Sequence, residues 1–386
     1  MPRIVRRRGK YLVPSFTKLW KPVQLILPNT PPLTSRGNRP LQMDFEHHLK
    51  ALVYYHLEGH ESAQELLQEL QENDFARQYI APPDGIEKSS FSEAINSRGL
   101  EQFLYVFEQL YSQAYQTLPV QYTELGELIA IDGSLIDGVL SMTWADYRKG
   151  SKKAKSHLGF DINRSIPRKV YLTDGKTDER PFVSKILNPG QTGVMDRYYQ
   201  HHRNFDLYQQ EGKHFICRIK ASTKKTCLKS NELPKDSFIF YDALVLLGTP
   251  YVNQTKKEVR LVGYTVEGVK YWIATDRFDL TAEQVAMAYK LRWEVEKFFA
   301  WWKRHLNVYH LIARSEHGLM VQILAGLITY LLLAIYCHEE HGEKVSIKRV
   351  RELRNQMRNE IAQLDETDSE PDNSGLQKDF PIHASP

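Results

Sequence analysis

The sequence predicts an α/β fold in which a small, mainly α-helical unit precedes a mixed domain of strands and helices. Three observations support this class. Apolar residues recur at helical spacing from Asp44 to Tyr79, and a second helical pair follows from Ser90 to Leu118. From Glu124 onward, short apolar runs alternate with helical segments. The segment from Thr226 to Asp276 is rich in strand-like runs, and the 386-residue chain is long enough for two or three domains.

The first 120 residues divide into an arm and a helical unit. Residues 1–43 are basic and rich in proline, which predicts an extended arm. Residues 44–120 predict a helical N-terminal domain, in which Gly59 separates two periodic runs between Asp44 and Tyr79. A second helical pair follows from Ser90 to Leu118 and is broken at Asn96–Gly99.

Residues 121–312 predict the mixed domain. Strands are expected in ELIAIDGS, GVLSMTWADY, KVYLTDG, TGVMDRYY and HFICRIKAS, and helices over 179–187 and 198–210. The first strand ends at Asp132, the TGVM strand ends at Asp196, and the basic stretch KKAKSH connects two of the others. A β-rich insertion of about 222–276 follows, and then a strongly periodic helix from Thr281, a plausible N-cap, to Leu306.

Residues 313–358 predict C-terminal helices. Within them, Gly318–Cys337 is apolar and about long enough to span a bilayer. Gln322 interrupts this run, which favours a buried core helix, although length alone leaves a membrane span open. Residues 359–386 carry seven acidic residues against Lys378, which predicts a disordered acidic tail.

Charge is distributed unevenly on a chain whose net charge is only +4. Residues 1–43 contain nine Lys or Arg and no acid, and Met142–Lys169 contains eight basic residues against two acids. Two such stretches indicate a polyanionic partner, while a solvated surface explains either stretch alone. The three cysteines lack the spacing of zinc ligands and fit a reducing compartment, and no secretory signal follows the N-terminus.

Two aspartates share a local context. Asp132 and Asp196 each follow an apolar run, at the point where a predicted strand gives way to a turn or helix. The carboxyl ends of strands gather functional groups in sheets flanked by helices. For one such Asp alone, a helix cap or a turn residue is an equally ordinary interpretation.

The helix around Tyr289 carries four polar groups on one stripe. Tyr289, Arg292, Glu296 and Lys303 fall within an arc of about 60° at about 100° per residue. The neighbouring arc is apolar, so this face should bury against a core and hold Glu296 rigidly. The alternative is a solvated face in which Arg292 and Glu296 form an i,i+4 ion pair.

These four residues match a Y-x2-R-x3-E-x6-K signature. In this signature the chain resembles the insertion-sequence family 4 transposases. Asp132 in IDGS and Asp196 in VMDRYY resemble the first and second catalytic aspartates of that family. Asp196 lies 64 residues after Asp132, and Glu296 lies 100 residues after Asp196. The resemblance covers roughly Glu124 to Ile312, and its long second gap implies a ribonuclease-H-like fold with a β-rich insertion.

The resemblance implies a cut-and-paste DNA transposase with three catalytic carboxylates, Asp132, Asp196 and Glu296. These residues would hold two Mg2+ ions, with Asp132 as the bridging ligand, and Mn2+ would substitute. Water would cleave one strand, and the released 3′-hydroxyl would attack the opposite strand to form a hairpin. After the hairpin is reopened, the 3′-end would attack target DNA.

The resemblance also assigns residues that would contact DNA. Arg292 and Lys303 would hold phosphates near the cut, and Tyr289 would bond a phosphate or pack beside the displaced nucleotide. Trp272 in KYWIATD resembles a tryptophan that stacks on a flipped base in a relative. Packing under the sheet is an equally good interpretation of Trp272.

Charge alone suggests further DNA contacts. Lys152, Lys153, Lys155 and His157 would contact the DNA backbone, as would the basic arm from Arg3 to Lys21, although simple surface explains either equally well. His201, His202 and Arg203 fit a solvated helix face better than ligands. The family implies two partners: double-stranded DNA, as terminal inverted repeats and as target, and a second copy of the chain in a homodimer. It also implies a location in the bacterial cytoplasm, without a membrane. The sequence does not decide whether residues 44–120 bind DNA.

Three alternatives use the same observations. A nuclease of the same fold without a joining step would use the same three carboxylates. A non-catalytic DNA-binding protein derived from a transposase would have no need for all three carboxylates, and all three are present. A membrane protein anchored by Gly318–Cys337 would use the apolar run.

Overall fold

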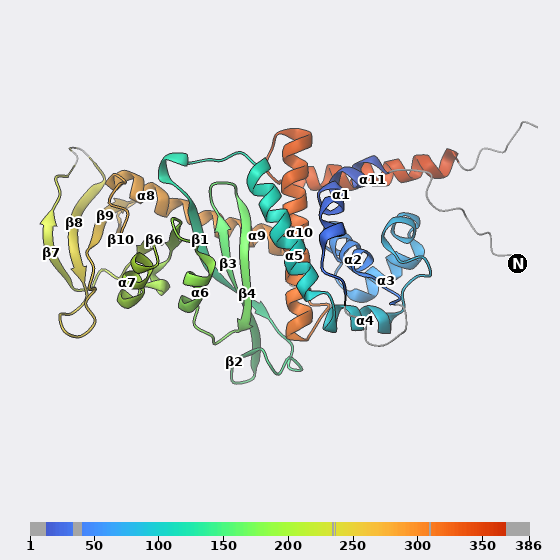
Figure 1. Cartoon of the computed structure of the whole chain (residues 1–386), viewed down its shortest axis with the longest axis horizontal. Helices are drawn as coiled ribbons and strands as arrows, with labels where there is room; N and C mark the ends of the chain where they lie inside the picture. Colours follow the sequence, from blue (N-terminus) through green and yellow to red (C-terminus); the bar gives the residue numbers. More distant parts are fainter. Residues whose placement is uncertain (1–12, 34–40, 234, 236, 309, 368–386) are drawn as a thin grey trace, which may run out of the picture.

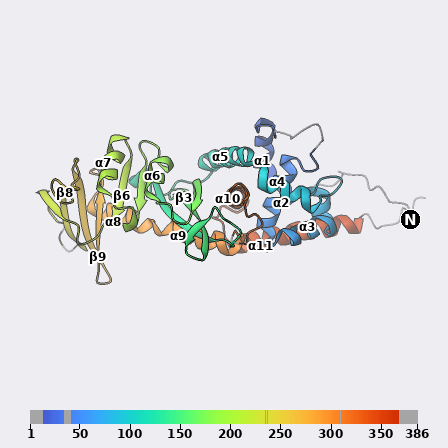
Figure 2. The same ribbon diagram turned by 90° about the horizontal axis from the view of Figure 1, so that it is seen from below.

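The computed structural model describes residues 13–33, 41–233, 235, 237–308 and 310–367. The molecule is elongated, with a β-sheet towards one end and a group of helices at the other (Figure 1). The long helix α10 (Glu316–His341) lies between these parts and is seen nearly end-on in Figure 2. The predicted α/β class with a mainly helical N-terminal part is therefore confirmed.

The N-terminal part is built from helices whose ends the sequence signals. Its α-helices are α1 (Pro14–Ile26), α2 (Phe45–Glu58), α3 (Ala63–Glu72), α4 (Lys88–Ser97) and α5 (Leu100–Thr117), with short turns η1 (Leu27–Asn29) and η2 (Ala76–Ile80). The side chain of Asp44 accepts a hydrogen bond from the backbone N–H of His47 and so caps α2. Gly59 ends the same helix in the left-handed region, at φ 79°, which favours glycine.

Part of the predicted extended arm is helical. Helix α1 contacts α5, α10 and α11. Its buried apolar side chains recur every three or four residues and therefore share one face: Phe16, Leu19, Trp20 and Val23. Pro14 stands in the first turn, where the missing N–H of proline leaves no hydrogen bond unmade. The prediction of an extended chain is wrong for Pro14–Ile26, and residues 1–12 and 34–40 of the arm lie outside the described residues.

A single ten-stranded sheet runs through the described residues of the mixed domain. Its strands are β1 (Leu128–Asp137), β2 (Asp146–Arg148), β3 (Ser151–Asp161), β4 (Ile166–Asp174), β5 (Thr192–Met195), β6 (His214–Arg218), β7 (Lys225–Ser230), β8 (Ile239–Leu247), β9 (Val259–Val266) and β10 (Val269–Thr275). Their order is β2-β3-β1-β5-β6-β10-β9-β8-β7, and β4 pairs with β3. Strands β1, β5 and β6 are parallel, whereas β7 to β10 are antiparallel, so the β-rich segment extends the same sheet.

Three predictions about strands are wrong. Of the expected strand GVLSMTWADY, only the last two residues belong to a strand, the short β2. Strand β1 does not end in a turn at Asp132 but continues to Asp137, because it pairs with β3 along its whole second half. The basic stretch KKAKSH, expected to connect strands, lies inside β3 itself. Polar side chains are accommodated in this ladder because partners stand opposite them, as Lys153 stands opposite Asp137 and forms an ion pair with it.

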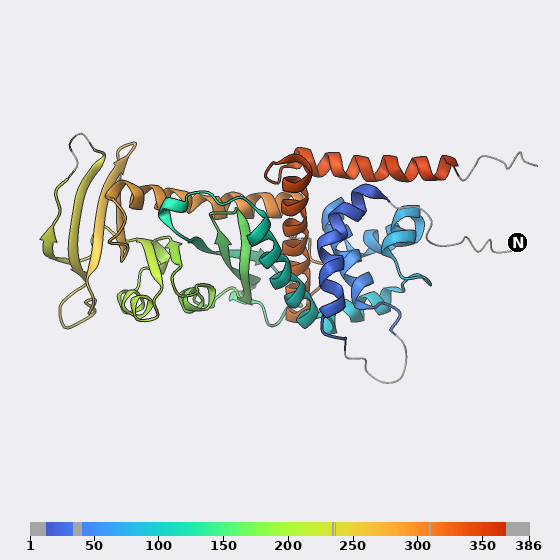
Figure 3. The ribbon, with the colours of Figure 1, turned by 45° about the horizontal axis from the view of Figure 1, so that its top comes forward.

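Helices cover both faces of the sheet near β1, β5 and β6 (Figure 3). Helices α6 (Arg180–Ile186) and α7 (His202–Gln210) contribute buried side chains to one apolar cluster. Helices α8 (Ala282–Leu291) and α9 (Trp293–His305) contribute to the cluster on the other face. Short turns η3 (Thr123–Leu125) and η4 (Arg197–Tyr199) precede β1 and follow β5.

The long helix predicted from Thr281 to Leu306 is present as α8 and α9. Thr281 and Gln284 form a reciprocal capping box that fixes its start. The two helices meet at Arg292, whose backbone keeps right-handed helical angles of φ −52° and ψ −31°. The stripe that carries Tyr289, Arg292, Glu296 and Lys303 is therefore built on two nearly continuous helices.

The apolar C-terminal run is a core helix in this structure. Helix α10 is long and apolar enough to cross a membrane, but 89% of its most apolar window is buried inside the protein. The interrupting Gln322 is fully buried, accepts from the N–H of Ile312 at 3.1 Å and donates to the carbonyl of His310 at 2.8 Å. These bonds satisfy its amide and explain why a polar residue is tolerated there.

Helix α11 (Ile347–Thr367) continues beyond the predicted C-terminal helices. The prediction of disorder is wrong for residues 359–367, and the rest of the tail, 368–386, lies outside the described residues. Glu360 provides one reason, since its carboxylate accepts from the backbone N–H and the hydroxyl of Ser15 at 3.0 and 2.6 Å. An acidic residue of the tail thus anchors α11 to the first turn of α1.

Candidate active site

Asp132 and Asp196 occupy corresponding positions on adjacent parallel strands. The last register pair between β1 and β5 joins Ile131 to Met195, and each aspartate is the next residue along its strand. Adjacent strands lie about 4.8 Å apart, so the register places the two carboxylates side by side. The sequence placed both aspartates after apolar runs, and the family resemblance paired them as catalytic residues.

Side-chain alternation shows which face of the sheet the two carboxylates occupy. Ile131 and Met195 belong to the apolar cluster beneath α6 and α7, whereas Ala130 and Val194 belong to the cluster that includes α9. Successive side chains of a strand point to opposite faces. Asp132 and the neighbouring Asp196 therefore lie on the face that α9 covers.

Glu296 stands on α9, which packs on the same face and contacts β1. Its carboxylate accepts a hydrogen bond from Nη2 of Arg292 at 2.6 Å. The side chains of Arg292 and Glu296 are 13% and 30% exposed, so this pair is half-buried rather than a solvated surface pair. The ion pair expected as the alternative thus exists, and the charge of its guanidinium also acts on Asp132.

The other two residues of the stripe surround this pair. Tyr289 is buried, its ring is tilted against Tyr271 at 6.3 Å, and the guanidinium of Arg292 lies 5.9 Å from its centre. Burial lowers the pKa of Lys303, and the negative charge of Asp132 opposes that shift. The structure therefore brings Arg292 and Lys303 within electrostatic reach of Asp132.

The environment of Asp132 disfavours its charged form. Burial raises the pKa of Asp132 to about 7, and the charges of Asp196 and Glu179 act in the same direction. Arg292 and a 2.9 Å hydrogen bond from the N–H of Gly133 oppose this shift. A group that titrates near neutral pH inside a half-buried site is a candidate functional residue.

A hydrogen-bonded group beside Asp132 escaped the sequence interpretation. Glu179 accepts a hydrogen bond from the hydroxyl of Tyr199 at 2.7 Å and pairs with Lys155 at 3.2 Å. A Cβ atom at Gly133 would lie only 2.5 Å from the Glu179 carboxylate, which explains glycine after Asp132. No local pattern marks Glu179, because it belongs to a loop that only the folded sheet brings to this place.

The basic stretch of β3 was predicted to contact DNA, but two of its residues are buried. Lys155 is 8% exposed and His157 is 1% exposed. The imidazole of His157 stacks on Phe182 at 4.0 Å and shares a hydrogen bond with the hydroxyl of Thr173. The predicted backbone contact with DNA therefore does not hold for Lys155 and His157 in this structure, because the sheet buries both. Lys153, which is paired with Asp137, remains partly exposed.

Trp272 lies half-buried in β10. Its ring packs edge-on against Phe240 and Tyr241 at 5.1 and 5.2 Å, and Nζ of Lys225 lies 3.9 Å from its centre. These contacts account for the tryptophan as a packing residue of the insertion. The role of stacking on a base stays a prediction.

The donor chemistry of the site fits a hard divalent cation. Asp132, Asp196 and Glu296 offer only carboxylate oxygens, the ligands that Mg2+ prefers. Across the residues that the structure describes, no three acidic, histidine or cysteine side chains already lie close enough together to hold a metal ion. The bond from Arg292 to Glu296 gives a physical reason, since it turns this carboxylate to the guanidinium.

Comparison with known proteins agrees with this arrangement. Residues 124–332 match the family model described as the transposase DDE domain, which covers more than half of the chain. The protein belongs to this family of DDE transposases, and its resemblance to the insertion-sequence family 4 enzymes is confirmed.

Individual relatives carry the same kind of name. A probable transposase for insertion sequence element IS5377 from Geobacillus stearothermophilus is 29% identical over 55% of this chain and 57% of its own length. A putative transposase for insertion sequence element IS4SA from Synechocystis is 22% identical over 69% of this chain and 77% of its own length. The chain thus aligns with little more than half of the first of these relatives.

Proposed function

We propose that this protein is a cut-and-paste DNA transposase that cleaves the ends of an insertion sequence and joins them to target DNA. The observation that supports this most is the placement of Asp132 and Asp196 side by side on parallel strands, facing the helix that carries Glu296. These three residues are the proposed catalytic carboxylates.

The proposal includes a ribonuclease-H-like catalytic core. Its support is the order of the strands: β1, β3 and β4 are antiparallel neighbours, and β5 and β6 continue the sheet in parallel with β1. Strands β7 to β10 lie between Asp196 and Glu296 in the sequence and extend the sheet past β6. They are the β-rich insertion of this proposal.

Asp132, Asp196 and Glu296 would hold two Mg2+ ions, which Mn2+ could replace. Bound metal supplies an activated water and neutralises charge on the phosphate and on the leaving oxygen. Asp132 must be deprotonated to act as a ligand, and its raised pKa links this event to neutral pH. To act as a metal ligand, Glu296 would give up its hydrogen bond to Arg292. The freed guanidinium could then bind a phosphate oxygen.

The protein groups around the carboxylates have distinct proposed tasks. Arg292 and Lys303 hold phosphates beside the cut, and the buried Tyr289 packs against Arg292 and orients it. Strand cleavage by water releases a 3′-hydroxyl, which attacks the opposite strand to give a hairpin and, after reopening, attacks target DNA. Each step is an in-line displacement at phosphorus, so one arrangement of residues can serve all of them.

The proposed partners are double-stranded DNA, as terminal inverted repeats and as target, and a second copy of the chain. Two ends must be cut and joined together, which requires at least a dimer on DNA. The proposed location is the bacterial cytoplasm.

The test is cleavage of a labelled duplex that carries the ends of the element, with Mg2+, by wild type and by Glu296→Ala. Glu294→Ala is the matched control, because Glu294 is a partly exposed carboxylate on the same helix, paired with Lys297. We expect wild type and control to nick at the terminus, and Glu296→Ala to bind DNA but to cut at least about 10³-fold more slowly, a loss of about 4 kcal/mol.

Three outcomes separate the alternatives. Equal cutting by Glu296→Ala would show that Glu296 is no metal ligand. Cleavage without transfer of the 3′-end to target DNA would identify a nuclease that does not join. Binding without cutting by wild type would identify a non-catalytic DNA-binding protein.

A further inference from the structure

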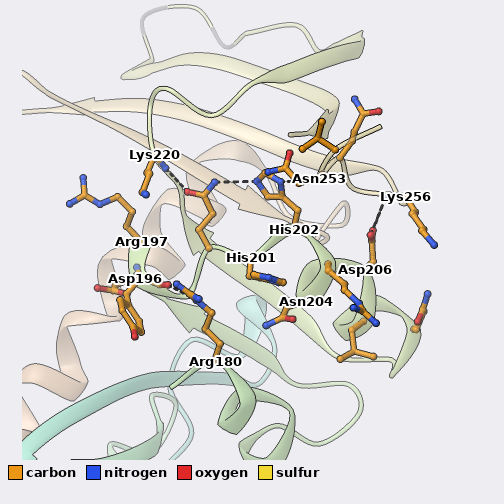
Figure 4. Close-up of a pocket in the computed structure, with 17 residues that line it drawn as sticks. Arg180, Asp196, Arg197, His201, His202, Asn204, Asp206, Lys220, Asn253 and Lys256 are labelled. Carbon is orange, nitrogen blue, oxygen red and sulfur yellow. Dashed lines mark hydrogen bonds between the residues drawn. The ribbon is translucent and has the colours of Figure 1, made fainter. Parts of the chain in front are cut away.

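A groove of about 990 Å³ opens beside Asp196 on the side of α7 (Figure 4). One wall is formed by η4 and α7, which follow Asp196 in the chain. The other wall is formed by the loop between β8 and β9, including Val252–Gln254 and Lys256. The groove therefore begins at a proposed catalytic residue and leads away from it.

Specific hydrogen bonds hold the two walls together. The ring of His202 shares a 2.8 Å hydrogen bond with the carbonyl of Asn253. The carboxylate of Asp206 accepts from the backbone N–H groups of Lys256 and Lys257 at 3.0 and 2.9 Å. Because the walls come from segments about 50 residues apart, these bonds give the groove a fixed shape before any ligand binds.

The charge that lines the groove is positive. Its carboxylates are Asp196 and Asp206, and the latter is already satisfied by backbone N–H groups. Among the described residues, Arg180 is the lining cation that forms an ion pair, with Asp178 at 3.5 Å. Lysine and arginine side chains outnumber the acids five to two: Arg180, Arg197, Arg203, Lys220 and Lys256.

An exposed aromatic ring stands at the end of the groove near Asp196. Tyr198 is 47% exposed, and the guanidinium of Arg180 lies 5.0 Å from the centre of its ring. Nε of Arg180 also donates to the carbonyl of Tyr198 at 3.1 Å, which fixes the two side by side. Aromatic faces beside cations form the stacking surfaces of grooves that bind nucleic acid strands.

We propose that this groove binds a DNA strand that passes the site at Asp196, with its phosphates on Arg203, Lys220 and Lys256 and a base on Tyr198. The proposal rests on the proposed function, since it assumes that DNA is cut at Asp196. It assigns His201–Arg203, interpreted from sequence as a solvated helix face, to the wall of a DNA-binding groove. The strand belongs either to the DNA that flanks the element or to the target.

The test measures DNA affinity as a function of salt for Lys220→Gln/Lys256→Gln. Both side chains are exposed, so the substitutions should leave the fold intact. The matched control is Lys88→Gln/Lys229→Gln, which removes two exposed lysines on α4 and β7. Three DNAs are compared: a precut end without flank, an uncut end with flank, and unrelated duplex offered to protein already assembled on precut ends.

We expect the groove variant to lose about one unit of salt slope per lysine and about tenfold or more in affinity at physiological salt. Loss on the flanked end assigns the groove to flanking DNA, and loss on the unrelated duplex assigns it to target. If the groove variant matches the control on all three DNAs, the proposal is overturned.

Failure of the proposed function gives a different result. Wild type that binds DNA but never cuts would refute the transposase chemistry. The salt dependence of DNA binding by the groove variant and its control would still test the groove. A further variant, Arg203→Gln added to the pair, should lower the slope again if the strand follows the wall of α7.

Discussion

The three proposed catalytic carboxylates and the groove beside them meet at Asp196, but their charged side chains differ in burial and pairing. Around Asp132 the charges are half-buried and paired, as in the bond from Arg292 to Glu296, and burial raises the pKa of Asp132 to about 7. Along the groove, the cations are mostly exposed and, within the described residues, all but Arg180 lack an acidic partner. The charged groups around Asp132 are therefore largely shielded from water, whereas most cations of the groove are solvated.

This difference follows from two tasks. Chemistry on a phosphate is favoured where protein groups are oriented in advance and water is excluded. Binding a strand without reading its bases needs accessible cations that can replace the counterions of DNA. Substitutions at the carboxylates should therefore change rates and pH dependence, and those in the groove should change affinity and salt dependence.

Outside the three carboxylates themselves, the largest effect should come from Arg292→Ala. This change removes the group that orients Glu296 and the charge that opposes the raised pKa of Asp132. We expect single-turnover cleavage to slow by about 10²–10³-fold at neutral pH. The rise of the rate with pH should move to higher pH, because Asp132 must lose its proton and now does so less readily.

The pH–rate profile of Arg292→Ala between about pH 6 and 9 measures both effects. Lys297→Ala is the control, since Lys297 is an exposed cation on the same helix that pairs with Glu294. A profile that keeps its midpoint would contradict the assigned influence of Arg292 on Asp132.

A smaller effect of the opposite sign is expected from Glu179→Gln. The amide can still accept from Tyr199, but the negative charge that raises the pKa of Asp132 is gone. The rise of cleavage with pH should therefore move to lower pH. Losing the ion pair with Lys155 should loosen the support of Asp132 and slow cleavage by about tenfold at its plateau.

Asp178→Asn provides the comparison for Glu179→Gln, because Asp178 is the exposed neighbour and pairs with Arg180 instead. Profiles of both variants are recorded on the same labelled end. Identical midpoints for the two would mean that Glu179 does not act on Asp132.

The smallest effect is expected from Gly248→Ala, in the loop that forms the second wall of the groove. Gly248 has φ 105°, and a Cβ there would lie 2.5 Å from the carbonyl oxygen of Asn253 and 2.6 Å from the ring of His202. We expect a few-fold loss of DNA affinity and a stability loss of more than about 1 kcal/mol. Cleavage of DNA that is already bound should keep its rate.

Gly268→Ala controls for backbone strain alone. Its φ of 78° is also left-handed, but a Cβ there meets nothing within 4 Å. Equal losses of DNA affinity in the two variants would remove the loop of Gly248 from the groove.

The sequence predicted best what depends on neighbours along the chain. Asp44, Gly59 and Thr281 mark helix ends by their own chemistry, and all three mark them in the structure. The same holds for Glu296 and Arg292, whose spacing on one helix follows from its period. Asp132 and Asp196 could be singled out because each follows an apolar run, whereas the parallel pairing that places them side by side comes from the fold.

What escaped prediction depends on contacts between distant segments. The basic residues of β3 read as a connection, because only pairing with β1 and β4 makes them a strand. Glu179 and the groove wall at Asn253 carry no local pattern, since a sheet and a loop bring them to Asp132 and His202. Helix α1 was missed because a proline-rich segment is usually read as extended chain. Its apolar face is explained only by its contacts with α5 and α10.

Helix α10 has a consequence for how the protein unfolds. It contacts α2, α4 and α5 in the N-terminal part and β4 in the sheet, and one apolar cluster continues through all of them. Cutting the chain near residue 120 would strip one side of this helix and expose its leucines and isoleucines to water. The N-terminal helices are therefore not an appendage: they and the catalytic part should lose their structure in one cooperative transition.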